Sequence, residues 1–478
     1  MSTRFLPAAH GGPVPRTCLP HARPRTTVRP IVLLLTMAAA LVGASPRLGA
    51  QPLPTAAPGH RLDSLVAQAL ATSPALRAAR ARVEAARARV TPAGLRPDPM
   101  LMAGVQNFPV SEPGFQDFMT MRMVGVGQTV PYPGKLALRR QAARRDAEAA
   151  QAALAGVTRQ VARDVRGAYY ELAFLDQALD VVGRNQRVLG DFVRVAEARY
   201  TVGQAGPQGA GLQDVLRARV EATRLAETAV SLTEQRRAAL ARLNAALDRP
   251  TDTPVADPRV PGRVARAAVA DSAGRVRFVS AVLGARAADS PLPPLTALQE
   301  TALRESPMLL EQEAAIAAQA ARAELARREY FPDVDVSVQY GQRRGLSDMV
   351  TATVSVPLPL QKRRRQDLLV AEARAEVAAL EAERAARRNE IRAEVARLYS
   401  ELERQRAQLA LYVKAVIPQG RAALTSATAS YQVGRVEFLT LLDTQATLFT
   451  YETEYFRTLS DFATTLAELE RVVGREVL

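Results

Sequence analysis

Cysteine, histidine and tryptophan are almost absent from this chain. Its 478 residues include one Cys, three His and no Trp, and Cys18, His10 and His21 all precede residue 50. Beyond that point His60 is the only imidazole, so disulfides, Cys/His zinc sites and histidine-based acid–base catalysis are excluded or nearly so. The carboxylates lie along charged helix faces, without metal-ligand spacing or a nucleophile elbow. We therefore expect no metal site, no cofactor and no enzymatic activity.

Aromatic residues and long apolar runs are also scarce. Phe, Tyr and Trp together make up 5% of the chain, whereas Ala, Arg, Glu and Leu are abundant, which is typical of long helices. After the first 50 residues no apolar run is long enough for a membrane-spanning helix. If the protein lives in a membrane, strands must hold it there.

The positive charge does not indicate a nucleic-acid partner. The chain carries +15, but residues 1–50 hold six Arg and no acidic residue, so the remainder carries +9. Beyond residue 50 basic and acidic residues alternate along helical stretches, which indicates solvated helix faces with ion pairs rather than a clustered basic surface. A genome rich in Ala and Arg codons would give the same balance.

Residues 1–50 have the pattern of a secretory signal peptide. A basic, proline-broken segment precedes the apolar run 31–42 (IVLLLTMAAALV), and small residues follow. We expect export, with cleavage after Ala44 or Ala50; an uncleaved N-terminal anchor is the alternative. No Cys follows the apolar run, so a lipid-modified N-terminus is not supported.

The rest of the chain contains an internal duplication. The helical pattern of 61–90 with its Ser73-Pro74 break matches 295–326 with Ser306-Pro307. The helix-ending motif YTVG at 200–203 is repeated as YQVG at 431–434. Because the order of the matches is kept, we predict a first structural repeat over 61–249, a connecting segment over 250–294 and a second repeat over 295–473.

Each repeat contains one predicted β-hairpin. The paired segments are 100–108 with 118–130, and 334–342 with 349–356, and all are rich in Val, Met, Phe and Thr. Two hairpins are too few to close a barrel, so their edges must pair with other copies of the protein. Strands of roughly 9 to 11 residues cross a bilayer, which fits a membrane barrel built by several chains. A small soluble sheet capping a helical bundle is the alternative.

Proline-rich turns end both hairpins. Proline lacks a ladder donor and the residue before it avoids the helical region, so these turns terminate strands and reset the chain direction. The residues are Pro131, Pro133, Gly134 and Lys135 in the first repeat, and Pro357 and Pro359 in the second. Lys135, together with nearby Arg residues, is expected where a strand leaves the membrane. Gly134-Lys135 lacks the remaining residues of a phosphate-binding loop.

Long helices follow each hairpin. Apolar residues step by three or four along 136–200 and 366–431, which predicts coiled-coil helices, the first on the order of 95 Å long. Pro418 should kink or interrupt the second of them. Return helices are predicted over about 212–247 and 436–473. The fold class is therefore mainly α with a smaller β part.

This layout resembles the TolC-like outer-membrane efflux factor family over nearly all of the chain after the leader. The segments that carry the resemblance most specifically are 124–135 (VGVGQTVPYPGK), VIPQGRAAL from Val416, and 431–448 (YQVGRVEFLTLLDTQATL). The proline-glycine-lysine exit is similar to that of the branch associated with metal and drug efflux. The resemblance implies a homotrimer in the outer membrane of a Gram-negative-type cell. In it, four strands per chain form a twelve-stranded β-barrel that continues into a periplasmic α-barrel.

The same resemblance implies partners and site residues. The two helical reversals would form a periplasmic tip that contacts an adaptor (membrane fusion) protein working with an inner-membrane pump, and the contact residues would be Val202, Gly203, Val433, Gly434 and Arg435. Asp443 matches an aspartate that helps to close the pore, while the acidic position one turn earlier is Thr440 here. The first reversal, 204–211, is longer and richer in Gly than the family pattern. Asp443 could equally be an ordinary carboxylate near a helix N-terminus.

The sequence thus predicts a passive exit duct in contact with outer-membrane lipid and without a nucleic-acid partner. A soluble periplasmic coiled-coil scaffold or adaptor is the alternative, although it leaves the Val- and Met-rich hairpins without a purpose. A secreted enzyme has the least support.

Overall fold

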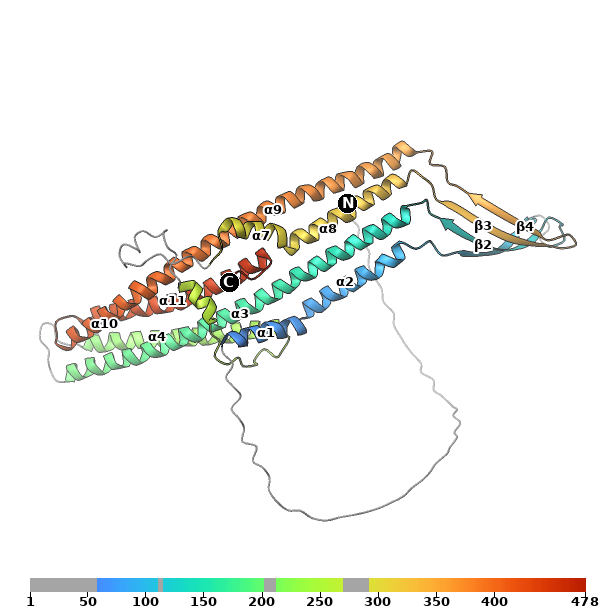
Figure 1. Cartoon of the computed structure of the whole chain (residues 1–478). Helices are drawn as coiled ribbons and strands as arrows, with labels where there is room; N and C mark the ends of the chain where they lie inside the picture. The colour runs from blue at the N-terminus through green and yellow to red at the C-terminus, as the bar shows by residue number, and fades with distance from the viewer. Residues whose placement is uncertain (1–57, 111–114, 202–211, 270–291) are drawn as a thin grey trace, which may run out of the picture. The chain divides into compact units, whose positions relative to one another are not determined.

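The computed structural model describes residues 58–110, 115–201, 212–269 and 292–478 (Figure 1). The predicted signal peptide and the first helical reversal lie outside these ranges. Within them, no helix is both long and apolar enough to cross a lipid bilayer.

The predicted elements of the first half are confirmed. They are α1 (Pro58–Thr72), α2 (Pro74–Ala93), β1 (Met100–Gln106), β2 (Met121–Val130), α3 (Lys135–Thr201) and α4 (Leu212–Ala246). A short helix, α5 (Gly262–Val269), lies in the connecting segment.

The elements of the second half follow in the same order. They are α7 (Leu295–Glu305), α8 (Pro307–Arg328), β3 (Val334–Arg343), β4 (Met349–Ser355), α9 (Gln366–Leu411), α10 (Ile417–Gln432) and α11 (Phe438–Val473). The two helix breaks have nearly the same backbone conformation: Ser73 has φ −51° and ψ 123°, and Ser306 has φ −63° and ψ 121°. Each serine precedes a proline, whose ring disfavours the helical conformation of the residue before it.

The long helices form a wall in which α2 and α3 of the first half lie beside α8 and α9 of the second half, in chain order. Helix α3 packs against α2 on one side and α8 on the other, and α8 packs against α9 (Figure 1). The wall leads at one end into the strands. Towards the other end α3 pairs with α4, α10 pairs with α11, and α11 packs on both α3 and α9.

The expected interruption at Pro418 takes the form of a π-helical turn. Residues Tyr412–Val416 form this turn between α9 and α10, directly before Ile417 and Pro418. Proline has no amide hydrogen, so a backbone carbonyl of the preceding turn loses its partner, and a wider turn accommodates the change.

All four strands join in one antiparallel sheet of order β1-β2-β3-β4. The two hairpins meet at β2 and β3, whose register runs from Met121↔Arg343 to Val130↔Val334. Strands β1 and β4 are therefore the edges, and neither has a second partner among the described residues.

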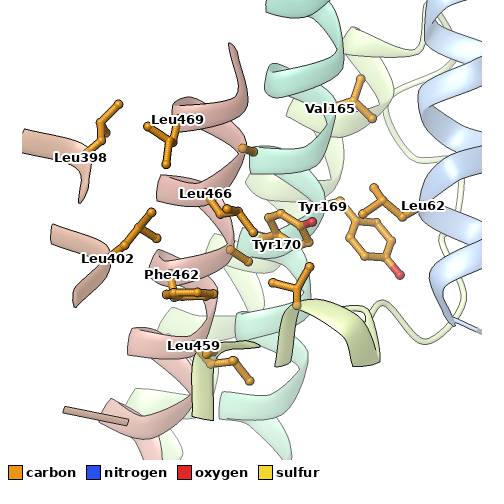
Figure 2. Close-up of a cluster of buried hydrophobic side chains, with 14 of the residues drawn as sticks. Leu62, Val165, Tyr169, Tyr170, Leu398, Leu402, Leu459, Phe462, Leu466 and Leu469 are labelled. Atoms are coloured by element: carbon orange, nitrogen blue, oxygen red, sulfur yellow. The ribbon is translucent and has the colours of Figure 1, made fainter. Parts of the chain in front are cut away.

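A large apolar core ties the helices together midway along the wall. Figure 2 shows Leu459, Phe462, Leu466 and Leu469 of α11 between Leu398 and Leu402 of α9 and the tyrosines of α3. Tyr169 lies on the other side of α3, beside Leu62 of α1 (Figure 2), and is fully buried. A second core towards the helical tip contains Leu189, Phe192 and Leu225 of the first half together with Tyr431, Phe438 and Leu441 of the second.

Ion pairs between helices reinforce the contact of α3 with α11. The Arg166 guanidinium lies 2.7 Å from Glu470, and the Arg457 guanidinium lies 2.9 Å from Glu171. The sequence predicted charge pairs within solvated helix faces, and several of these exist, but these two pairs join segments about 300 residues apart in the chain.

Candidate functional site

The strand exit of the first half is a buried polar junction. After β2 the chain passes through Pro131, Tyr132 and Pro133 to Gly134, whose φ of +90° favours glycine. A side chain at Gly134 would also meet the Arg328 guanidinium at 3.1 Å. Helix α3 then begins at Lys135.

Lys135 is buried, with only 1% of its side chain exposed. Its Nζ lies 3.1 Å from Glu329 Oε2 and 2.9 Å from Asp333 Oδ1, at the end of α8 and just before β3. The same Asp333 oxygen accepts a hydrogen bond of 2.9 Å from the Tyr132 amide. Lys135 therefore joins the strand exit of one half to the strand entry of the other.

The electrostatics of this junction favour charged Asp333. Partial burial works against its charged form, but hydrogen bonds from Lys135 and the Tyr132 amide outweigh this effect, so the pKa of the Asp333 carboxyl is below its usual value. The rings of Tyr132 and Phe331 stack beside it, with centroids 4.5 Å apart. The Arg328 guanidinium also donates a hydrogen bond of 3.1 Å to the Pro133 carbonyl.

The second strand exit is built differently, although the sequence suggested equivalence. Pro357, Leu358 and Lys362 are exposed, Pro359 is partly buried, and a 3-10 turn over Lys362–Arg364 precedes α9. The equivalent lysines therefore differ: Lys135 holds two carboxylates, whereas Lys362 faces solvent.

One face of the sheet is apolar, and the other combines polar side chains with methionine and glycine. Side chains of one face form an exposed apolar band across all four strands: Leu101, Ala103, Val105, Val124, Val126, Val336, Val338, Tyr340, Val350, Ala352 and Val354. Polar Gln128 and the pair Arg122 and Gln342 flank this band. The opposite face carries Asp335, Ser337, Gln339, Thr351 and Thr353. Such a band is typical of strands that face lipid on one side and water on the other.

The second helical reversal has the hydrogen bonds of a Schellman motif. The Arg435 amide donates to the Ser430 carbonyl at 2.8 Å, and the Gly434 amide donates to Tyr431 at 3.0 Å. Gly434 has φ +73°, the left-handed conformation that this helix ending requires. Val433 is 67% exposed at the apex. The predicted contact residues Val433, Gly434 and Arg435 therefore lie together, whereas Val202 and Gly203 lie outside the described residues.

Asp443 and Thr440 occupy one exposed face of α11. Their side chains point away from the buried face of this helix, which contains Phe438, Leu441 and Gln445. Among the described residues Asp443 has no ion-pair partner.

A buried polar pair near the tip was missed by the sequence reasoning. Gln445 of α11 donates a hydrogen bond to Asn185 of α3, and their side chains are 7% and 5% exposed. The signal was present: in the apolar stepping of α3, Asn185 fills the position between Val182 and Leu189. A polar residue in a coiled-coil seam fixes the register of the two helices.

Charged side chains of three helices also meet near this pair. Glu452 of α11 is 12% exposed and lies 2.7 Å from Arg421 of α10 and 4.0 Å from Arg184 of α3. In the described part of the chain, no group of three His, Cys, Asp or Glu side chains could hold a metal ion.

Comparisons with known proteins agree with this architecture. A curated relative, the cobalt-zinc-cadmium resistance protein CzcC of Cupriavidus metallidurans, is 24% identical over 349 residues, which cover 72% of this chain and 74% of the relative. Among solved structures, the outer-membrane channel OprN has a TM-score of 0.70 at 19% identity, over 86% of this chain and 89% of its own. The outer membrane protein VceC of Vibrio cholerae has a TM-score of 0.69 at 19% identity, over 88% and 97%.

The family itself is shown by a family model. The model of outer membrane efflux proteins matches residues 65–249 and 298–475, which is most of the chain and leaves out the connecting segment. The helical wall, the four strands and this match lead to one conclusion: the chain belongs to the outer membrane efflux protein family and is an outer-membrane efflux channel that extends into the periplasm.

Proposed function

We propose that three copies of this chain form a passive exit duct of a tripartite efflux system. The observation that carries the proposal is the sheet, which combines an exposed apolar band with two edges, β1 and β4, that pair with no further strand in the described part of the chain. Exposed edges of this kind pair with other chains, and closure into a barrel removes every edge. Three four-stranded sheets give a barrel of twelve strands.

The oligomeric state tests this proposal directly. We would measure the mass of the detergent-extracted protein by size-exclusion chromatography with light scattering, corrected for bound detergent. A trimer is expected. A monomer, or protein recovered only from the soluble periplasm, would contradict the shared barrel.

High-salt washing of membranes tests the alternative of a soluble scaffold. A peripheral coiled-coil protein would be released from membranes by high-salt washing. The duct must stay in the membrane until detergent is added, because burial of its apolar band is insensitive to salt. The exposed band favours the duct, since a scaffold leaves it uncovered.

We place the gate at the helical tip, at Asp443 and Thr440. Both side chains are exposed on α11, and in a trimer three Asp443 carboxylates would converge, bind cations and repel anions. Val202, Gly203, Val433, Gly434 and Arg435 would be the adaptor contacts, and the inner-membrane pump would act through that adaptor. Pro131, Pro133, Gly134, Lys135, Pro357 and Pro359 would hold the strand exits where the barrel meets the periplasmic helices.

Single-channel conductance in planar bilayers tests the gate. Asp443→Ala, combined with substitutions near Thr440, is expected to raise the basal conductance. Asp63→Ala is a matched control, because Asp63 is also an exposed helical aspartate but lies on α1. Equal conductance of wild type and the Asp443 variants would remove Asp443 from the gate.

A further inference from the structure

Arg122 is the only charged residue that the four strands carry on the apolar face of the sheet. In the register it lies between Val105 of β1 and Gln342 of β3, in the last row of this face before the hairpin loops. Its side chain is exposed. An arginine on a lipid-facing strand is costly at the centre of a bilayer but costs little at the membrane surface. Arg122 therefore belongs at the level of the lipid headgroups.

The length of the strands agrees with this placement. Strands β2 and β3 have ten residues each, which is about what a tilted strand needs to cross the hydrocarbon core. Arg122 is the second residue of β2, so it lies close to one surface of the membrane. The hairpin loops lie at the end of the sheet opposite to the helical wall (Figure 1). Because the wall extends into the periplasm, Arg122 faces the outer leaflet.

A hollow of about 290 Å³ lies beside Arg122, between the start of β2 and the end of β3. It is lined by Phe115, Thr120, Arg122, Gln342, Arg343 and Arg344. Three of these residues carry a guanidinium group, and none of them is acidic. A concave surface lined by charge of one sign attracts ions of the opposite sign, here an anion.

The carboxylates of the two hairpin loops are engaged elsewhere. Asp117 is the one acidic residue in the described part of the first loop, and its Oδ1 accepts a hydrogen bond of 2.8 Å from the Met119 amide. In the second loop, Asp348 accepts a hydrogen bond from the Tyr340 hydroxyl. Both carboxylates thus stabilise loop structure, and within the described ranges neither forms an ion pair with an arginine of the hollow.

Two of the three guanidinium groups are available to a ligand. The Arg343 guanidinium donates to the Ser347 carbonyl at 2.7 and 3.0 Å, which holds it within its own loop. Arg344 is exposed and donates only a long hydrogen bond of 3.4 Å to Gln116. Neither Arg344 nor Arg122 has a carboxylate partner in the part of the chain that the structure describes.

Aromatic side chains position Arg122 and mark the same membrane level. The Arg122 guanidinium lies over the Phe115 ring, 4.6 Å from its centroid, which is a cation–π contact. Phe115 in turn packs edge-on against Phe108, with ring centroids 5.8 Å apart. Phe108 and Phe118 are both exposed. Aromatic residues gather at the headgroup level of membrane barrels, so these rings support the placement of the hollow there.

We propose that Arg122 and Arg344 bind a phosphate group of an outer-leaflet lipid headgroup. The planar guanidinium group matches phosphate through paired N–H···O hydrogen bonds. In the outer leaflet of an outer membrane this phosphate belongs to a phosphorylated glycolipid, whose acyl chains would lie along the apolar band below. The proposal rests on the proposed function only in taking this band as the lipid-facing surface.

Binding of purified lipid A to the full-length protein tests the proposal. The protein is purified in non-ionic detergent and freed of bound lipid, and native mass spectrometry then measures the number and affinity of bound lipid A molecules. The same lipid after enzymatic removal of its phosphates is the comparison. Phosphate-dependent binding is expected. Arg122→Gln and Arg344→Gln should each weaken it about tenfold or more, because each removes hydrogen bonds between charged groups.

Two further variants make the test specific. Arg122→Lys keeps the charge but loses the planar fork, so it should bind more tightly than Arg122→Gln and more weakly than the wild type. Arg96→Gln is the matched control, because Arg96 is also exposed but precedes β1 at the periplasmic end of the sheet. Its binding should equal that of the wild type. Each variant must keep the wild-type mass in detergent and the helical circular dichroism signal.

The outcomes separate a lipid site from its alternatives. Equal binding of the phosphorylated and the dephosphorylated lipid, or an equal loss in Arg96→Gln, would overturn the site. Displacement of lipid A by an equal concentration of inorganic phosphate would show that the hollow takes free phosphate, which would overturn the assignment to a lipid.

The test also distinguishes this site from the duct. Mass in detergent and single-channel conductance in bilayers of neutral phospholipid should be the same in the wild type and the glutamine variants. A monomer that binds phosphorylated lipid A would refute the duct and leave the lipid site standing. A trimer whose glutamine variants bind this lipid as tightly as the wild type would refute the lipid site and leave the duct standing.

Discussion

Lys135 provides a quantitative test of how the two halves of the chain are joined. Its side chain is 1% exposed, whereas the side chains of Glu329 and Asp333 are 39% and 27% exposed. Neutralising both carboxylates leaves a buried ammonium without a counter-ion. Replacing Lys135 leaves two carboxylates that water reaches, one of which keeps Arg139 at 3.8 Å. The carboxylate double variant should therefore be the less stable of the two.

The magnitudes follow from the burial. An uncompensated buried charge costs about 3–5 kcal/mol, so Glu329→Gln/Asp333→Asn should lose that much. Lys135→Met should lose about 1.5–3 kcal/mol, the value of a hydrogen bond to a charged group. With about 2.1 cal/mol/K of unfolding entropy per residue, a chain of 478 residues changes its Tm by about 1 °C for each kcal/mol. The triple variant removes every charge and should recover part of the loss.

The assay is thermal unfolding of the detergent-purified protein, followed by helical circular dichroism. Lys362→Met is the matched control at the second strand exit; it removes an exposed charge and should change stability by less than about 0.5 kcal/mol. If Lys135→Met lowers the Tm more than the carboxylate double variant does, or no more than Lys362→Met does, the reasoning from burial is wrong.

Three further predictions follow from the junction and the tip. Because folding lowers the pKa of Asp333, the contribution of this carboxylate to stability is present above about pH 4 and is lost as the pH falls further. The stability of Asp333→Asn should therefore fall less steeply with pH in that range than the stability of the wild type. Identical acid-unfolding curves would contradict this. Gly434→Ala should destabilise the tip by about 1 kcal/mol and speed hydrogen exchange over residues 430–440. Gly345→Ala is the control: Gly345 has a similar φ of +75° in a strand loop, and its replacement should not affect that segment. Gln445→Leu leaves the Asn185 amide oxygen without its partner and should lower the free energy of unfolding by about 1–3 kcal/mol. A second change, Asn185→Leu, should restore part of this stability in thermal unfolding. A further loss in the double variant would be evidence against the pairing.

Much of the fold could be predicted because its signals are local. Proline after Ser73 and Ser306 set the helix breaks, and stepping of apolar residues located the long helices to within a few residues. Val-Gly at 433–434 indicated the reversal, since a glycine in the left-handed conformation ends a helix. The predicted strands began up to three residues from their observed starts, because alternation is weakest where strands meet loops.

The candidate site was predicted only in part, because burial depends on segments distant in the chain. Pro-Gly-Lys indicated that a strand ends before Lys135, but nothing near this residue in the sequence indicated that Glu329 and Asp333, almost 200 residues away, would enclose its ammonium group. The same pattern of Pro and Lys at the second exit led to an exposed Lys362.

Local periodicity was sufficient to specify the kinds of element, their order and the duplication, since the backbone conformation of each segment is set by residues a few positions apart. The pairing of β2 with β3, the contact of Asn185 with Gln445 and the ion pairs of Lys135 arise from contacts between the two halves. Such contacts are selected by the summed packing of the whole assembly of helices and strands, so they become visible only when the chain is folded.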